Sequence, residues 1–419
     1  MDKFIINGPS ILSGEVEISG AKNAVLPIMT ACLSFPGVYK LKNVPMLRDT
    51  KTMIKLLEII GAEVDVSNDE LVINSKKCNN PEAPYELVKT MRASFYVLGP
   101  LLSRFKYSKV SLPGGCAWGP RPVDYHIKAF EQMGAKVTLK GGYILAEGAL
   151  SGTIIEFEKS SVGATGNVLM ACVNLNEKVI IKNAAMEPEI VDLCHFLIKI
   201  GVKIDGVGTS ELKIVGLDNK TESVNVEHTI IPDRIEAGTF LVASAITKSD
   251  LKIVNVNPNH LTAVTDALLA SGCEIKTDET SISIFPGKSI KPVNIITDIY
   301  PGYPTDLQAQ WVVLMSLADG RSMVQDTIYN DRFSHIPELN RLGAQITLEE
   351  NIAYIEGVKK LYGAEVMSTD IRASAAMILG GIAAFGETVL SRIYHIDRGY
   401  ENIEFKLSRI GVDIKRVDY

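Results

Sequence analysis

A helix that ends in glycine and runs into an alternating strand recurs six times along the 419 residues, and this repeat restricts the fold more than any other feature. Glycine after an amphipathic helix supplies the left-handed helix end, and alternating apolar and polar residues are typical of a half-buried strand. The six glycines, spaced 67 to 73 residues apart, are Gly61, Gly134, Gly201, Gly272, Gly343 and Gly411. The chain is therefore predicted to consist of six similar units.

The sixth unit is incomplete, because the chain ends at Tyr419 before a second strand can follow Gly411. Residues 4–19, FIINGPSILSGEVEIS, resemble the segment that follows the glycine in complete units, for example YILAEGALSGTIIEFE. We therefore expect the N-terminus to close the last unit, so that both chain ends belong to one domain.

Each unit also contains a helix that is apolar on nearly every side, which predicts a buried helix with strands and outer helices packed around it. These segments are residues 21–34, 92–103, 163–174, 236–247, 307–318 and 372–385. Three units make a domain of ordinary size. We expect two similar α/β domains, one over residues 22–229 and the other over residues 230–419 together with residues 1–21.

Composition excludes several classes of protein. The formal net charge of -6 gives no basic surface for nucleic acid, so any anion site must be a local cluster. Uncharged runs such as residues 24–39 are shorter than the ~20 residues of a membrane span, and the start lacks the pattern of a signal peptide. The six cysteines form no CxxC pair, which favours reduced thiols. A cytoplasmic protein is expected.

Several buried helices begin beside charged or amide side chains, where free N–H groups and the helix dipole favour phosphate or carboxylate. These residues are Lys22, Asn23, Arg92, Asp306, Asp370 and Arg372. They either line an anion site or only cap helices and form ion pairs. Asp306, after the turn YPGYPT, is in the same way either a helix cap or a general base.

The segment SLPGGCAWGPRPVDYH, residues 111–126, is predicted to be a loop because it holds paired glycines and three prolines. Cys116 lies in it near Arg121, and a neighbouring cation can lower the pKa of a thiol. Such a thiol can exchange protons or attack an electrophile, whereas most cysteines are inert packed residues. Cys32, Cys172 and Cys194 lie in apolar helical runs and are therefore predicted to be inert, packed residues.

Arg332, Arg372 and Arg398 stand in turn-like contexts, and guanidinium forks match carboxylates and phosphates. The sequence contains no GxxxxGK[ST], GxSxG, HExxH or strand-linked GxGxxG motif, and its six histidines lack metal-ligand spacing. No metal site and no cofactor are expected.

The chain resembles the UDP-N-acetylglucosamine 1-carboxyvinyltransferases, enolpyruvyl transferases that begin peptidoglycan precursor synthesis. The likeness spans nearly the whole chain and rests on GAKNAVLP (20–27), MRASFYVLGPL (91–101), LPGGC and RPVD (112–124), SVGAT (161–165), EPEIVD (187–192), PDRIEAGTF (232–240), YPTDLQAQ (303–310), NDRF (330–333), TDIRA (369–373) and IDRGY (396–400). It implies a two-domain inside-out α/β barrel with three repeats per domain and the active site in the cleft between the domains.

The resemblance also implies roles for individual residues. Lys22, Arg121 and Arg398 are expected to contact phosphoenolpyruvate, with Arg92, Arg332 and Arg372 completing a positive cluster. Asn23 and Asp306 are expected to hold the sugar hydroxyls, with Asp306 as the base for the 3-hydroxyl. The UDP group is expected along Arg121, Pro122, Val123, Asp124, Ser161, Val162 and Gly163, and Ile328 and Asp370 are further expected substrate contacts.

By the same resemblance, Cys116 protonates C3 of phosphoenolpyruvate, the sugar oxygen adds at C2, and the resulting ketal loses phosphate. UDP-sugars formed later in the pathway are expected inhibitors. Trp118 and Gly166 differ from the residues usual in the family. Two alternatives stay open: enolpyruvyl transfer to shikimate 3-phosphate, whose enzymes lack the loop cysteine, and a catalytically idle UDP-sugar-binding paralogue with a regulatory role.

Overall fold

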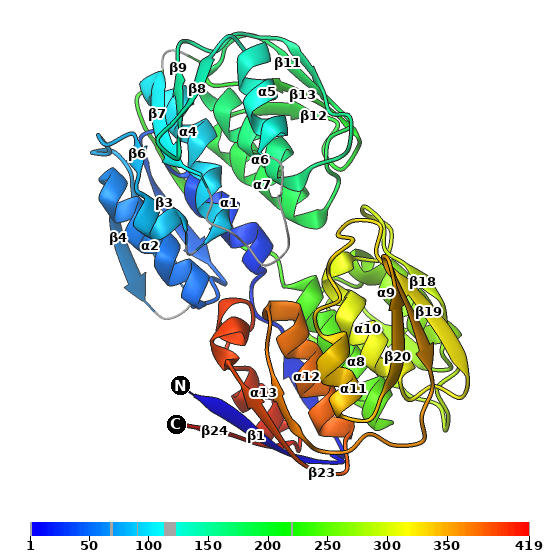
Figure 1. The fold of residues 1–419 in the computed structure, drawn as a ribbon. Coiled ribbons are helices and arrows are strands. Elements are labelled where there is room, and N and C mark those ends of the chain that lie inside the picture. Colours follow the sequence, from blue (N-terminus) through cyan, green and yellow to red (C-terminus); the bar gives the residue numbers. More distant parts are fainter. Residues whose placement is uncertain (1, 68–69, 90, 113–122, 219–220, 419) are drawn as a thin grey trace. The chain divides into compact units, whose positions relative to one another are not determined.

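The computed structural model describes residues 2–67, 70–89, 91–112, 123–218 and 221–418. The chain divides into two compact units. Unit 1 comprises residues 1–19 and 232–419, and unit 2 comprises residues 20–231. Figure 1 shows the fold of both units as a ribbon.

Unit 2 contains three four-stranded sheets in its described residues, with the strand orders β14-β3-β5-β4, β6-β7-β9-β8 and β10-β11-β13-β12. The strands are β3 (Gly37–Lys42), β4 (Glu63–Ser67), β5 (Glu70–Asn74), β6 (Glu82–Ala83), β7 (Tyr107–Ser111), β8 (Lys136–Lys140), β9 (Tyr143–Glu147), β10 (Ile154–Glu156), β11 (Val179–Lys182), β12 (Lys203–Asp205), β13 (Glu211–Val215) and β14 (Val224–Thr229).

Unit 1 also contains three four-stranded sheets within its described residues, with the orders β16-β17-β15-β2, β18-β19-β21-β20 and β22-β23-β1-β24. The strands are β1 (Lys3–Gly8), β2 (Glu15–Glu17), β15 (Leu251–Val254), β16 (Glu274–Thr277), β17 (Ser281–Phe285), β18 (Ile295–Ile296), β19 (Arg321–Gln325), β20 (Gln345–Glu349), β21 (Ile352–Glu356), β22 (Glu365–Met367), β23 (Gly386–Ser391) and β24 (Asp413–Val417).

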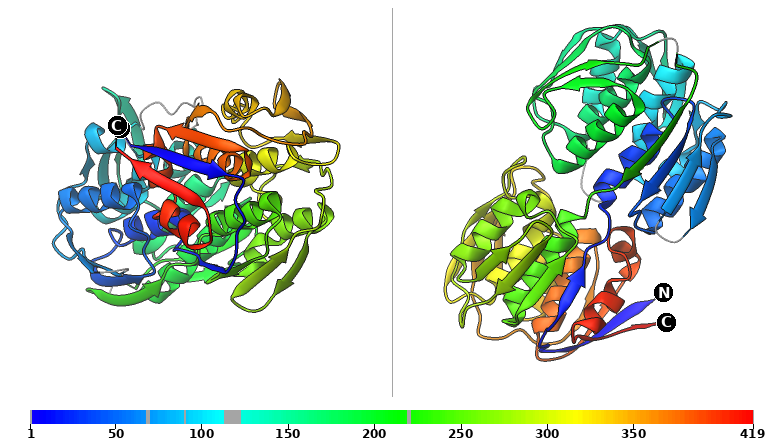
Figure 2. Two further views of the ribbon diagram at one scale, coloured as in Figure 1. Left: turned by 90° about the horizontal axis from the view of Figure 1, so that it is seen from below. Right: turned by 180° about the vertical axis from the view of Figure 1, so that it is seen from behind.

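All six sheets share one pairing pattern: a parallel pair at one edge, then two antiparallel pairs. In the sixth sheet the inner antiparallel position is taken by β1, which lies between β23 and β24. The two chain ends are therefore neighbours in unit 1, as Figures 1 and 2 show. The sixfold repeat is confirmed.

The apolar helices occupy the middle of each unit. They are α1 (Lys22–Ala31), η1 (Arg92–Val97, a 3-10 helix) with α4 (Leu98–Phe105), α6 (Val162–Ala171) with η2 (Cys172–Asn174), α8 (Arg234–Thr247), η4 (Thr305–Leu307) with α10 (Gln308–Met315), and α12 (Ile371–Ala383). Every residue of α10 is buried. The helix predicted over 92–103 begins as 3-10 helix, and Pro100, which has no N–H, falls in the first turn of α4, where no N–H is needed.

The outer helices precede the six glycines. They are α2 (Arg48–Ile60), α5 (Asp124–Gln132), α7 (Pro188–Ile200), α9 (Thr262–Ala270), α11 (Ile336–Arg341) and α13 (Ile403–Arg409), with α3 (Tyr85–Val88), η3 (Pro258–Leu261) and η5 (Ile393–Arg398) as short additions. All six glycines have positive φ, between 95° and 115°. This left-handed backbone is the conformation predicted for them.

Each unit has its own hydrophobic core. One cluster of buried side chains runs from Ala21 to Ile230 and the other includes Phe4 to Ile18 and Ile235 to Ile414. The chain crosses between the units twice, and the two segments bond to each other there. The Asp233 N–H donates to the Ser19 carbonyl at 2.9 Å, and the Ala21 N–H donates to the Ile231 carbonyl at 2.7 Å.

In the part of the chain that the structure describes, no helix is both long and apolar enough to cross a membrane.

Candidate active site

Asp306 binds two of the predicted arginines in unit 1. It lies in η4, directly after the Pro301 to Pro304 turn. Arg332 Nη2 donates to its Oδ1 and Arg372 Nη2 donates to its Oδ2, each at 2.7 Å. The Asp306 side chain is 22% exposed, whereas those of Arg332 and Arg372 are 10% and 7% exposed. Three residues separated by up to 66 positions thus form one partly buried charge cluster.

The arginines control the charge of this carboxyl. Burial alone raises the pKa of Asp306, but the neighbouring Arg372 and Arg332 outweigh it and hold the pKa well below its usual range. Burial likewise lowers the pKa of Arg372, and Asp306 reverses that effect and raises it above its usual range. A carboxylate with so low a pKa is a weak base near neutral pH. In this arrangement Asp306 holds two guanidinium groups.

Ring and hydroxyl groups support both guanidinium groups. The Arg332 guanidinium lies 5.4 Å from the centre of the Tyr329 ring and donates through Nη1 to Thr305 Oγ1 at 2.9 Å. That of Arg372 lies 5.9 Å from the centre of the Tyr400 ring. Thr305, Tyr329 and Tyr400 were missed by the sequence analysis, although Thr305 and Tyr400 stand beside predicted residues in the YPTD and IDRGY segments.

Asp370 acts as a helix cap. Its Oδ1 accepts from the N–H groups of Arg372 at 2.8 Å and Ala373 at 3.2 Å, both in the first turn of α12. One of the two roles expected for charged residues at helix starts was helix capping, and Asp370 has this role. The cap fixes the backbone of Arg372, whose side chain reaches Asp306.

A buried histidine lies next to the cluster. His335 directly precedes α11 and is 1% exposed. Burial, together with the nearby Arg332, lowers its pKa to about 3. His335 is therefore neutral at physiological pH, and it adds no positive charge to the cluster.

Arg398 ends η5 and is half-buried. Its neighbour Asp397 is fixed by Arg416 of β24, which donates through Nη2 to Oδ1 at 2.6 Å and through Nη1 to Oδ2 at 3.2 Å. The last strand of the chain thus anchors the segment that carries Arg398.

In unit 2, Lys22 begins α1 and forms an ion pair with Asp49 of α2 at 2.8 Å. The two side chains are 12% and 5% exposed. Asn23 follows in the first turn of α1. Asp49 is a buried partner that sequence reasoning missed, because nothing in the α2 sequence distinguishes it from an ordinary residue in the first turn of a helix.

Two predicted UDP-binding segments lie at neighbouring helix starts. Ser161 caps α6, its Oγ accepting from the Ala164 N–H at 3.3 Å, and Val162 and Gly163 form the first turn. Asp124 begins α5, and two positions later His126 packs so closely that a Cβ at Gly163 would lie 3.2 Å from its Nε2. Val123 directly precedes Asp124. The starts of α5 and α6 are therefore close together, and the start of a helix favours an anion.

Some predicted residues cannot be placed. Cys116, Arg121 and Pro122, as well as the side chain of Arg92, lie outside the described residues. Ile328 lies in the segment after β19, where its N–H donates to Asp326 Oδ1 at 2.9 Å. Among the described residues, no group of three or more His, Cys, Asp and Glu side chains could hold a metal ion.

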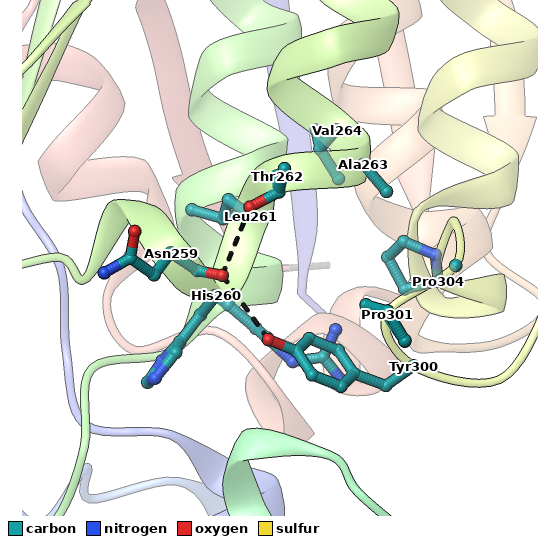
Figure 3. Close-up of a pocket in the computed structure, with 11 residues that line it drawn as sticks. Asn259, His260, Leu261, Thr262, Ala263, Val264, Tyr300, Pro301 and Pro304 are labelled. Carbon is teal, nitrogen blue, oxygen red and sulfur yellow. Dashed lines mark hydrogen bonds between the residues drawn. The ribbon is translucent and has the colours of Figure 1, made fainter. Parts of the chain in front are cut away.

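A pocket in unit 1 lies next to the turn that precedes Asp306 (Figure 3). The Asn259 carbonyl accepts from Thr262 Oγ1 at 3.3 Å and from the Tyr300 hydroxyl at 3.4 Å. The Arg234 guanidinium lies 5.6 Å from the centre of the Tyr300 ring. The lining includes Pro301 and Pro304 but none of the predicted site residues, so these contacts fix the turn rather than form the predicted site.

Comparisons with known proteins identify the family. Residues 6–407 match the family model described as EPSP synthase (3-phosphoshikimate 1-carboxyvinyltransferase). The chain is 51% identical to a UDP-N-acetylglucosamine 1-carboxyvinyltransferase from Chloroherpeton thalassium, over 100% of this chain and 98% of the relative. It is 49% identical to the protein of the same name from Geotalea daltonii, over the full length of both.

Solved structures share the fold. The enolpyruvyl transferase NikO from Streptomyces tendae has a TM-score of 0.90 at 22% identity, covering 99% of each chain. An EPSP synthase from Acinetobacter baumannii has a TM-score of 0.74 at 17% identity over the full length of both. The predicted two-domain enolpyruvyl transferase fold is confirmed. The chain belongs to the EPSP synthase family and, within it, to the UDP-N-acetylglucosamine 1-carboxyvinyltransferases.

Proposed function

We propose that the chain transfers the enolpyruvyl group of phosphoenolpyruvate to the 3-hydroxyl of UDP-N-acetylglucosamine and releases phosphate, as the first committed step of peptidoglycan precursor synthesis. Relatives aligned over the whole chain carry the name of this transferase. In the structure, the strongest support is the pair of buried guanidinium groups, Arg332 and Arg372, on one carboxylate. Guanidinium groups bind carboxylates and phosphates, and phosphoenolpyruvate carries both.

The substrate-binding residues are part of this proposal. Lys22, Arg121 and Arg398 hold phosphoenolpyruvate, and Arg92, Arg332 and Arg372 add positive charge. Val123 and Asp124, next to the Ser161 to Gly163 segment, are assigned to the UDP group together with Arg121 and Pro122, and the two adjacent helix starts support an anion there. Asn23, Ile328 and Asp370 complete the contacts.

Asp306 needs a change of partner before it can act as a base. Both of its oxygens accept from arginines, and its pKa is held well below its usual range. An anionic substrate that takes over Arg332 and Arg372 weakens both contacts, and the pKa of Asp306 then rises. Binding of phosphoenolpyruvate therefore makes Asp306 a stronger base for the sugar hydroxyl.

Proton transfers complete the reaction. The Cys116 thiol gives its proton to C3 of phosphoenolpyruvate while the sugar oxygen bonds to C2 and Asp306 takes the hydroxyl proton. The tetrahedral ketal then loses its phosphate group and a proton from C3, which the Cys116 thiolate takes back, and the departing phosphate takes the proton held by Asp306. The enol ether and inorganic phosphate remain. The arginines stabilise the phosphate and carboxylate charges throughout.

Phosphate release tests the proposed function. The protein is incubated with phosphoenolpyruvate and either UDP-N-acetylglucosamine or shikimate 3-phosphate. We expect phosphate release only with the UDP-sugar. Release only with shikimate 3-phosphate would assign the other acceptor, and UDP-sugar binding by calorimetry without any release would assign the idle paralogue. The same assay with UDP-sugars formed later in the pathway tests the inhibition expected from the sequence, and a cytoplasmic location is part of the proposal.

A further inference from the structure

Asp326, the residue after β19, is a fully buried carboxylate with four hydrogen bonds. Its Oδ1 accepts from Thr297 Oγ1 and from the N–H groups of Ile328 and Tyr329, each at 2.9 Å. Its Oδ2 accepts from Thr305 Oγ1 at 2.6 Å. Two hydroxyls and two amides thus surround a side chain that lies outside the predicted site.

Thr305 connects Asp326 to the charge cluster. Its hydroxyl donates to Asp326 Oδ2 and accepts from Arg332 Nη1 at 2.9 Å. The direction is fixed, because an ionised carboxylate can only accept, a guanidinium can only donate, and a hydroxyl has one proton. Asp326 therefore turns the Thr305 lone pairs toward Arg332.

Asp326 also fixes the ring beneath Arg332. Its Oδ1 accepts from the Tyr329 N–H, and the Tyr329 ring lies 5.4 Å from the Arg332 guanidinium. One carboxylate thus positions both the hydroxyl that binds Nη1 and the residue whose ring supports the guanidinium. The other terminal nitrogen, Nη2, is bound by Asp306.

We propose that Asp326 and Thr305 are positioning residues that keep Arg332 oriented toward phosphoenolpyruvate when Asp306 releases it. This assignment rests on the proposed function, in which Asp306 turns from the arginines to the sugar hydroxyl. At that step Arg332 loses its bond to Asp306, and the Thr305 hydroxyl keeps the guanidinium in place. Asp326 is fully buried and the Thr305 hydroxyl bonds to Asp326 and Arg332, so we assign both residues an action through Arg332.

Thr305→Val tests the proposal, because valine has nearly the same shape and no hydroxyl. A hydrogen bond to a charged group contributes about 1.5–3 kcal/mol, so we expect kcat/KM for phosphoenolpyruvate to fall roughly ten- to a hundredfold. The KM for UDP-N-acetylglucosamine should change less than about twofold, since the two lost bonds are those to Arg332 and Asp326. Thr305→Ser restores the hydroxyl and should recover most of the loss.

Asp326→Asn should act in the same direction. If the amide oxygen faces Thr305, the NH2 group meets the donors of Thr297, Ile328 and Tyr329. If the NH2 group faces Thr305, the hydroxyl proton turns toward Arg332. In either orientation two hydrogen-bond donors face each other, so the network that positions Arg332 is disrupted.

Thr297→Val is the matched control. Thr297 is fully buried and bonds to the same carboxylate, but no contact described for it reaches Arg332. It should lower thermal stability and leave kcat/KM for phosphoenolpyruvate within about twofold of wild type, because the two bonds lost, to Asp326 and from the Thr327 N–H, do not involve Arg332. An equal loss in both valine variants would show a general effect of folding and overturn the proposal.

A crystal structure of Thr305→Val with phosphoenolpyruvate bound tests the positioning without relying on catalysis, because in the free protein Asp306 still holds Arg332. We expect the Arg332 guanidinium to leave the place it has beside residue 305 and Tyr329. An unchanged Arg332 would overturn the inference even if the wild-type protein is active. A wild-type protein that releases no phosphate while Arg332 moves in the variant would overturn the proposed function and retain the positioning role.

Discussion

The sequence identifies Asp306 as a candidate site residue, but it does not show which side chains bind its carboxylate. The turn YPGYPT and the helix that follows suggested either a cap or a base. In the structure it forms ion pairs with Arg332 and Arg372, which stand 26 and 66 positions away. Such partners depend on tertiary packing, and no local pattern specifies them. Asp326 had no sequence signal at all, because a single aspartate after a strand is common in turns.

Removing the Asp306 charge should destabilise the protein at neutral pH. In Asp306→Asn, two buried guanidinium groups lose their counterion. Breaking a fully buried pair costs about 3–5 kcal/mol, and we expect roughly 1–3 kcal/mol because Asp306 is partly exposed. Urea unfolding at pH 7 measures this difference. An asparagine variant as stable as wild type would contradict the strength assigned to the cluster.

The pH dependence of that difference follows from the pKa of Asp306, which is lower in the folded state than in the unfolded state. The stabilisation is fully present above the unfolded pKa of about 3.9 and is lost as pH falls through the still lower folded pKa. The gap between wild type and Asp306→Asn should therefore stay constant from about pH 5 to 8 and shrink only in strong acid.

His335 should produce a second pH effect in the same unit, with the same sign but beginning at a higher pH. Its pKa is about 3 in the folded protein, against about 6.5 when unfolded, so the unfolded chain binds the proton first as pH falls. Stability should fall by up to about 1.4 kcal/mol per pH unit below pH 6.5. His335→Gln should flatten this slope between about pH 6 and 4. His195→Gln, the same change at an exposed position, is the control and should leave the slope as it is.

Cys116 is tested by two substitutions, since its loop lies outside the described residues. Cys116→Ala should reduce phosphate release by at least about a hundredfold, the usual contribution of a general acid, and leave UDP-sugar binding near normal. Cys116→Asp should be more active than the alanine variant, because a carboxyl group can still donate a proton. Normal turnover by the alanine variant would show that another group supplies it.

At the scale of elements, the six helix ends could be predicted because their cause is local. A left-handed residue after an amphipathic helix strongly favours glycine, and all six predicted glycines have positive φ. The type of helix at the start of the segment 92–103 was not predicted, since its first six residues form a 3-10 helix. Sheet pairing was harder to predict, because β14 pairs with β3 across nearly the whole of unit 2 and only the folded chain brings them together.

The contact between β24 and η5 should affect both stability and catalysis. Arg416 binds Asp397 through two nitrogens and Glu404 through Nε at 2.7 Å, and Asp397 directly precedes Arg398. Arg416→Lys keeps the charge but cannot form the paired bonds. We expect a loss of about 1 kcal/mol in urea unfolding and a several-fold lower kcat/KM for phosphoenolpyruvate.

Arg321→Lys is the control for this element. Arg321 also pairs with a glutamate, Glu356, but its side chain is 83% exposed. Exposed pairs contribute little, so neither stability nor kcat/KM should change measurably. A similar effect in both variants would show that the loss in Arg416→Lys does not act through Arg398.

At the scale of the whole molecule, the two separate cores predict that mutations in one unit leave the unfolding of the other unchanged. The chain has two tryptophans, and Trp311 is fully buried in the core of unit 1. In a Trp118→Phe background, fluorescence reports unit 1. Leu339→Ala in unit 1 and Leu57→Ala in unit 2 each remove a fully buried leucine, at a cost of about 2–5 kcal/mol.

We expect Leu339→Ala to lower the fluorescence midpoint in urea and Leu57→Ala to leave it unchanged while shifting the circular dichroism transition. Proteins with more than one domain often lack a single two-state transition. An equal shift of the fluorescence midpoint in both variants would show that the two units unfold as one cooperative system.

The place of β1 between β23 and β24 has a consequence for biosynthesis. Unit 2 is one continuous stretch of chain and can fold as soon as it leaves the ribosome. Unit 1 cannot complete its third sheet until residues 413–417 emerge, so the first eight residues must wait during nearly the whole of translation. At about 5–20 residues per second, this strand stays without its neighbours for roughly 20–80 seconds. Chaperones that bind nascent chains therefore have the longest access to the N-terminal strand.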